Sequence, residues 1–71
     1  MYLKPLALYV HRMGTLNSAA HAIGVDPSNM HKALRRQHFP SRWMAEALQA
    51  AKDKGVPLTA EELVYGACIE G

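Results

Sequence analysis

Residues 14–36 read GTLNSAAHAIGVDPSNMHKALRR, and this stretch decides the fold. It opens with Thr15, whose hydroxyl is suited to accept a backbone N–H in the first turn of a helix. Asp26 followed by proline is a second start signal, because the carboxylate caps a helix and proline suits its first position. Gly24 favours the left-handed conformation that ends a helix. The stretch therefore predicts two short helices joined by a tight turn.

The spacing of small and apolar residues in this stretch matches that of a helix-turn-helix. The second helix of this motif crosses the first, so the crossing point needs a small residue, and Ala20 supplies it. The turn glycine follows four residues later at Gly24, and Val25 is the apolar residue after it. The second helix then needs two buried positions three residues apart, which Met30 and Ala33 provide. In DNA-binding proteins this second helix lies in the major groove.

The rest of the chain also carries helix signals. Leu6, Tyr9 and Met13 recur at helical spacing, and Thr59 with Glu62 has the spacing of a capping box. No segment alternates apolar and polar residues as a half-buried strand would, so we expect no strands and a frayed C-terminal end. We expect helices over residues 5–13, 16–23, 27–36, 40–54 and 60–66. The predicted fold is a compact all-α domain of five helices, with the helix-turn-helix at about 15–36.

Length and composition exclude several classes of protein. A chain of 71 residues forms one small domain without an interdomain cleft, so we expect no enzyme and no small-molecule substrate. The single cysteine, Cys68, cannot form an internal disulfide. No pair of histidines has the spacing of a helical metal site, so we expect no metal and no cofactor; they are His11, His21, His31 and His38. We see no targeting segment or membrane span and expect a cytoplasmic protein.

Positive charge is concentrated in the first half of the chain. Residues 1–36 carry five lysines and arginines and one acid, whereas residues 37–71 carry three and five. On a helix that starts at Pro27, positions 28, 31, 32 and 35 share one outward face, and polar side chains there can bond to base edges. The candidate base contacts are Ser28, Asn29, His31, Lys32 and Arg35. The candidate phosphate contacts are Thr15 and Asn17, with Arg36, His38 and Arg42 at or beyond the end of that helix.

The stretch from Gly14 to Arg35 resembles the phage Cro repressors and related small prophage regulators. The residues similar to the family's recognition segment are Gly24-Val25, Ser28 and Lys32-Ala33. Gly14-Thr15 before an alanine-rich helix, and Pro40 before a later helix, are similar to the all-helical members. Asp26-Pro27 and Leu16 depart from the family's pattern, and they leave the operator sequence and one phosphate contact open.

The resemblance implies a Cro/lambda-repressor-like fold and a transcriptional regulator that binds double-stranded DNA. Such a regulator binds a palindromic operator as a homodimer, with the helix over 27–36 in the major groove, and most simply represses by excluding polymerase. It would work in the cytoplasm of a bacterial or phage-infected cell. An antitoxin or a prophage activator built on the same motif remains open, as does a helical protein-interaction module that does not bind DNA.

Two apolar segments are candidates for the dimer contact. Four side chains on the helix over 40–54 or just before it are expected in the core: Phe39, Trp43, Met44 and Leu48. Part of this face, or Leu63-Val64 with Tyr65, would join two copies. A monomer with so few cations binds DNA weakly, whereas two copies double the phosphate contacts.

Overall fold

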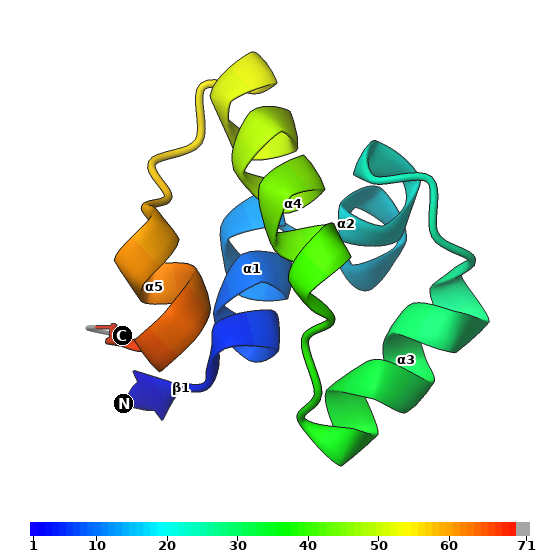
Figure 1. Ribbon diagram of the computed structural model, residues 1–71, viewed down its shortest axis with the longest axis horizontal. Helices are drawn as coiled ribbons and strands as arrows, with labels where there is room; N and C mark the ends of the chain where they lie inside the picture. Colours follow the sequence, from blue (N-terminus) through cyan, green and yellow to red (C-terminus); the bar gives the residue numbers. More distant parts are fainter. Residues whose placement is uncertain (70–71) are drawn as a thin grey trace.

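The computed structural model describes residues 1–69 and contains the five predicted helices. They are α1 (Pro5–Met13), α2 (Leu16–Ala22), α3 (Pro27–Arg36), α4 (Ser41–Asp53) and α5 (Ala60–Tyr65). Each helix boundary lies within one residue of its predicted position. The protein is therefore mostly helical, as expected (Figure 1).

The predicted caps set these boundaries. The Thr15 hydroxyl accepts the backbone N–H of Ser18 at 3.1 Å, and an Asp26 carboxylate oxygen accepts that of Ser28 at 2.8 Å. Thr59 and Glu62 form the reciprocal capping box at the start of α5. Gly24 has a φ of +69°, the left-handed conformation that an L side chain adopts only with strain. Local hydrogen bonds thus fix the starts of α2, α3 and α5, and the conformation of Gly24 shapes the turn between α2 and α3.

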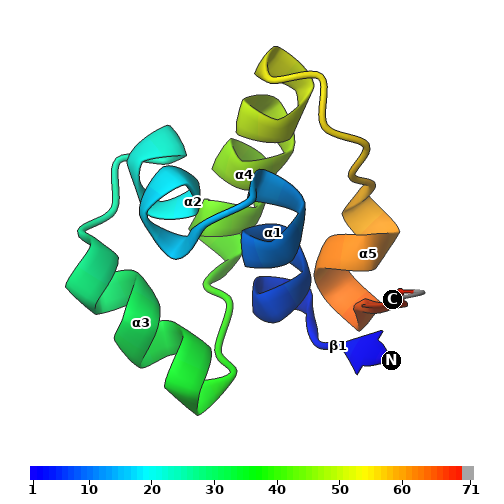
Figure 2. The ribbon, with the colours of Figure 1, turned by 180° about the vertical axis from the view of Figure 1, so that it is seen from behind.

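The core lies where α1 meets the other helices. Its fully buried members include Tyr9 from α1, Ala20 from α2, Met30 from α3 and Leu63 from α5. Figures 1 and 2 show α1 in the middle of the molecule, between α4 and the α2–α3 pair on one side and α5 on the other. Leu8 is also fully buried, although it lies outside the predicted apolar face of α1. A central helix that has neighbours on several sides buries more than one row of its side chains.

Tyr9 joins α1 to α2 through a buried hydrogen bond. Its hydroxyl donates to the backbone oxygen of Ala19 at 2.8 Å. That oxygen belongs to the last turn of α2, where the four final carbonyls lack partners within the helix. The next carbonyl, of Ala20, accepts from both Ile23 and Val25. Burial removes water from the phenol and raises the pKa of Tyr9 to about 12.

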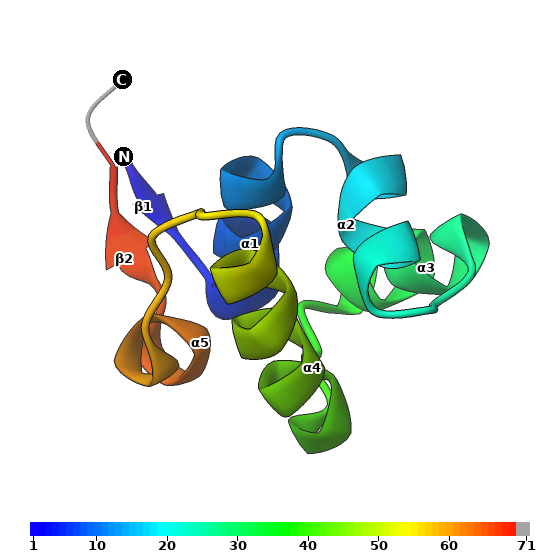
Figure 3. The same ribbon diagram turned by 90° about the horizontal axis from the view of Figure 1, so that it is seen from above.

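The expectation of helices only was wrong for residues 2–3 and 67–68, and the frayed end was wrong as far as Ile69; residues 70–71 lie outside the described part of the chain. Strand β1 (Tyr2–Leu3) pairs antiparallel with β2 (Ala67–Cys68), in the register Tyr2 to Cys68 and Leu3 to Ala67. The N–H of Ile69 also donates to the oxygen of Met1 at 2.7 Å. Strands of two residues are too short to show an alternating pattern, and their partners lie at opposite ends of the described chain. Figure 3 shows the pair side by side, next to α5.

An ion pair ties α1 to α5. Arg12 contacts a Glu62 carboxylate oxygen at 2.9 Å, and its guanidinium also donates to the backbone oxygen of Pro57. Partial burial of Glu62 opposes ionisation, but hydrogen bonds from Thr59 and the nearby Arg12 outweigh it and lower the pKa of that carboxyl. Both side chains are partly exposed, so this pair adds little to stability and mainly fixes the position of α5.

Helix α3 and the pair formed by α5 and β1 lie at opposite ends of the molecule. In Figure 1, α3 lies at one end of the longest dimension, and α5 with β1 lies at the other. That dimension is 28 Å between Cα atoms. Within residues 1–69, no helix combines the length and apolar character that crossing a membrane requires.

Candidate nucleic-acid interface

Helix α3 presents a polar face that is backed by a single fully buried anchor. Met30 is completely buried in the core, while Ala33 and Leu34 pack against the core from its border. The six side chains on the opposite side are all exposed: Ser28, Asn29, His31, Lys32, Arg35 and Arg36. Every predicted base contact therefore faces solvent. All of them lie on one helix, which Met30 attaches to the core.

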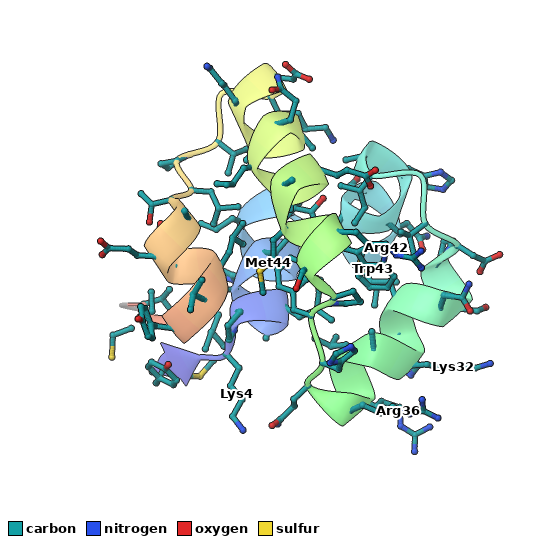
Figure 4. The ribbon with its side chains drawn as sticks, in the orientation of Figure 1. Lys4, Lys32, Arg36, Arg42, Trp43 and Met44 are labelled. Carbon is teal, nitrogen blue, oxygen red and sulfur yellow. The ribbon has the colours of Figure 1, made fainter. Side chains whose placement is uncertain are left out.

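Three cations are concentrated on this face. Lys32, Arg35 and Arg36 border one hollow in the surface, so their charged groups surround a common space. No acidic residue occurs in α3, and the ion pair between Arg12 and Glu62 is the only one formed among residues 1–69. In Figure 4, Lys32 and Arg36 point away from the body of the molecule. Three cations on a helix without an acid attract a polyanion more strongly than they attract a single carboxylate.

The angle of α3 is fixed by the turn that precedes it. The N–H of Val25 donates to the oxygen of Ala20 at 2.9 Å, which closes the end of α2. Ala20 is fully buried, as the predicted crossing point requires. The chain then leaves α2 at an oblique angle, and α3 projects along the edge of the molecule (Figures 1 and 2). Its outward face is thus accessible along the whole helix.

The start of α2 and the end of α3 carry four of the five predicted phosphate contacts. Thr15 and Asn17 are both exposed at the first turn of α2. The Thr15 hydroxyl accepts the N–H of Ser18 but keeps its own proton to donate. Arg36 and His38 are exposed where α3 ends.

Arg42 does not lie where the sequence analysis placed it. It lines a hollow with Gly24, Asp26 and Asn29, so it lies beside the turn before α3 rather than beyond the end of that helix. Figure 4 shows its side chain reaching from α4 toward this turn, next to Trp43. The prediction assumed that a residue after α3 in the sequence also lies beyond its end in space. The chain instead turns back after α3, so the first turn of α4 lies beside the turn between α2 and α3.

One cation near α3 was not predicted from the sequence. The Lys4 ammonium donates to the side-chain oxygen of Gln37, the residue that ends α3 in a left-handed conformation. Lys4 therefore lies beside the C-terminus of α3, on the side of β1 and away from Arg36 (Figure 4). Only the charge surplus of residues 1–36 hinted at such a role, because Lys4 precedes α1 and lies 33 residues from Gln37.

The histidines and the cysteine lie apart from the polar face of α3, except for His31 and His38. No group of three or more potential metal-binding side chains occurs within the described part of the chain. His11 and His21 are exposed on α1 and α2. Cys68 is an exposed free thiol on β2.

Comparison with protein-family models, with curated proteins and with solved structures found no match to this chain. The assignment of a function therefore rests on the geometry and charge of α2, α3 and their surroundings.

Proposed function

We propose that the protein is a sequence-specific DNA-binding transcriptional regulator in which α2 and α3 act as a helix-turn-helix. The observation that carries this proposal is the exposed face of α3, where hydrogen-bonding groups and three cations lie opposite the buried Met30. The major groove is about 12 Å wide and admits one α-helix, side chains included. A helix of ten residues spans about 15 Å, enough to cross several base pairs.

The side chains of α3 match the chemistry of base edges. Lys32 and Arg35 donate to the N7 and O6 acceptors of guanine, and arginine does so with two parallel bonds. Asn29 is suited to the N6 and N7 positions of adenine, while Ser28 and His31 can both donate and accept. These residues form the part of the interface that distinguishes sequences.

A second group of side chains is suited to phosphates, which fix the protein on the duplex without reading sequence. Thr15 and Asn17 offer donors at the N-terminus of α2, where the helix dipole also favours an anion. Arg36 lies at the other end of the polar face, Lys4 lies beside the C-terminus of α3, and Arg42 lies beside the α2–α3 turn. Two such domains on a palindromic operator double these contacts, and the resulting complex excludes polymerase.

The proposal is tested by selecting bound sequences from random duplex DNA and then measuring affinities for the selected site by fluorescence anisotropy. Lys32→Ala and Arg35→Ala are each expected to cost about 1–3 kcal/mol and to relax sequence preference at one position. Arg36→Ala is expected to weaken all sequences alike and to lower the salt slope by about one. Unchanged affinity for all three variants would remove α3 from the interface.

A role as antitoxin or activator uses the same interface and gives the same binding results. A helical protein-interaction module predicts a different outcome: no salt-dependent affinity for duplex DNA even at low ionic strength, where non-specific binding is strongest. That result would overturn the proposal.

A further inference from the structure

A hollow with an apolar base lies between β1, the first turn of α1 and the last turn of α3. Its volume is about 400 Å³, which falls within the range of about 300–1,000 Å³ typical of small-molecule pockets. Four apolar residues line it, of which the second is buried and the others are partly buried: Leu3, Leu6, Ala7 and Leu34. The other lining residues, Tyr2, Lys4 and Gln37, are exposed. The hollow therefore combines an apolar base with a polar edge.

Lys4 is the only charged residue that lines this hollow. Its ammonium donates to the side-chain oxygen of Gln37, a neutral acceptor, and it forms no ion pair within residues 1–69. A carboxylate is a stronger partner for an ammonium than an amide oxygen, because both groups are then charged. The hollow beside Arg42 differs, since Asp26 and Glu46 line it and would repel an anion. The hollow at Lys4 is thus suited to a molecule with one negative charge and an apolar body.

We propose that this hollow binds a small apolar monocarboxylate, such as a medium-chain fatty acid, and that the bound ligand lowers the DNA affinity of α3. The carboxylate contacts the Lys4 ammonium, which lies between β1 and the end of α3 (Figure 4). The apolar body covers Leu6 and Leu34 and is removed from water there. The effect on DNA binding rests on the proposed function, whereas the ligand site does not.

Helix α3 connects the two events, because Leu34 and Gln37 line the hollow at its last turn. The free carbonyls at a helix C-terminus carry partial negative charge, which a nearby cation such as Lys4 stabilises. A bound carboxylate neutralises this cation and draws it away from Gln37, so the last turn of α3 is loosened. Arg35 and Arg36 lie in that turn. The ligand thereby disturbs two cations on which the proposed DNA binding depends.

The ligand site is tested by an NMR titration of the ¹⁵N-labelled protein with octanoate, without DNA. Octanoate has few heavy atoms, so its Kd is expected at about 0.1–1 mM. Amide shifts are expected to concentrate in residues 2–7 and 34–37. The uncharged 1-octanol is expected to bind about two- to fivefold more weakly, which is the effect of one exposed ion pair.

Three variants locate the site. Lys4→Met removes the ammonium and is expected to weaken octanoate about two- to fivefold, with 1-octanol unaffected. Lys52→Met makes the same change on the exposed surface of α4 and is expected to leave both ligands unaffected. Ala7→Phe fills the hollow and is expected to abolish binding of both ligands. Circular dichroism checks that each variant is folded.

The effect on DNA binding is measured by fluorescence anisotropy with duplex DNA at low salt. About 5 mM octanoate, enough to fill most sites, is compared with the same concentration of acetate to keep the ionic strength equal. Octanoate is expected to weaken DNA binding of the wild type about two- to fivefold and to leave that of Ala7→Phe unchanged.

An absence of octanoate shifts around the hollow overturns the inference, and so does equal binding of 1-octanol or an equal loss in Lys52→Met. A wild type that binds DNA with the same affinity in octanoate and in acetate also overturns it. A protein that binds octanoate in the hollow but binds no duplex DNA contradicts the proposed function and supports the ligand site. A protein that binds DNA but no octanoate contradicts this inference alone.

Discussion

The polar face of α3 and the apolar surface formed by Met1, Tyr2, Val64 and Tyr65, which we call the end face, are both exposed, but they differ in almost every other respect. The α3 face carries Lys32, Arg35 and Arg36 and no acid, whereas the end face carries no charged side chain. Each is backed by one fully buried anchor, Met30 below α3 and Leu63 below α5. The comparison shows how a small helical domain can keep a surface suited to a polyanion separate from one suited to an apolar partner.

The largest expected effect comes from removing the charge of α3. The triple variant Lys32→Ala, Arg35→Ala, Arg36→Ala is expected to lose about 3–6 kcal/mol of specific binding and to reduce the salt slope by about three. Anisotropy titrations at several salt concentrations measure both quantities.

The double variant Lys52→Ala, Lys54→Ala is the matched control, because both cations lie at the far end of α4 from α3 (Figure 1). It is expected to bind almost as the wild type does. An equal loss per removed cation in the two variants would mean that total charge, not the α3 face, drives binding.

The two anchors give the next largest effect. Met30→Ala and Leu63→Ala each leave a cavity in a packed core and are expected to cost about 2–5 kcal/mol of unfolding free energy, measured by urea denaturation. Under conditions where both variants remain folded, Met30→Ala is expected to weaken DNA binding more, because it loosens α3. If the two variants bind DNA equally, the position of α3 does not depend on its anchor.

The hydrogen bond between Tyr9 and Ala19 supports the α2–α3 end of the molecule. Tyr9→Phe leaves a carbonyl oxygen buried without a partner and is expected to cost about 1–3 kcal/mol. The pKa of Tyr9 is raised to about 12 in the folded state, above its ordinary value of 10. The unfolded chain therefore loses this proton first, so stability is full below pH 10 and falls as the pH rises toward 12.

Denaturation curves at pH 8 to 12 measure this slope, which is expected to be smaller in Tyr9→Phe than in the wild type. A variant with the same slope as the wild type would assign the alkaline loss to other groups.

The smallest expected effect comes from removing the N-caps of α2 and α5. Thr15→Ala and Thr59→Ala each remove an N-cap and are expected to cost about 1 kcal/mol, measured by thermal unfolding. Thr15→Ala is also expected to weaken DNA binding slightly, whereas Thr59→Ala is expected to leave it unchanged. A loss of DNA affinity in Thr59→Ala alone would place the interface near α5.

The sequence was most informative where structure is decided locally. Caps such as Thr15 and Asp26 act within three residues, and Gly24 needs only its own backbone conformation, so the helix boundaries could be predicted. Burial of Met30 followed from helical spacing. For the same reason the exposed side chains of α3 could be named before the fold was known.

The sequence was less informative where distant segments meet. The pairing of β1 with β2 joins the two ends of the described chain, and burial of Leu8 depends on the neighbours of α1. Lys4 and Arg42 reach their places near α3 through the packing of other helices. Each of these features depends on the path of the whole chain, which no local pattern records.

An NMR titration of the ¹⁵N-labelled protein with a short DNA duplex at low salt tests most directly whether α3 binds DNA. We expect amide shifts to concentrate in α3 and at the start of α2, with smaller changes near Lys4 and Arg42. The end face is expected to change little on binding of the first duplex. An absence of shifts, or shifts centred on α5 and the β1–β2 pair, would contradict the assignment of α3 as the DNA-binding surface.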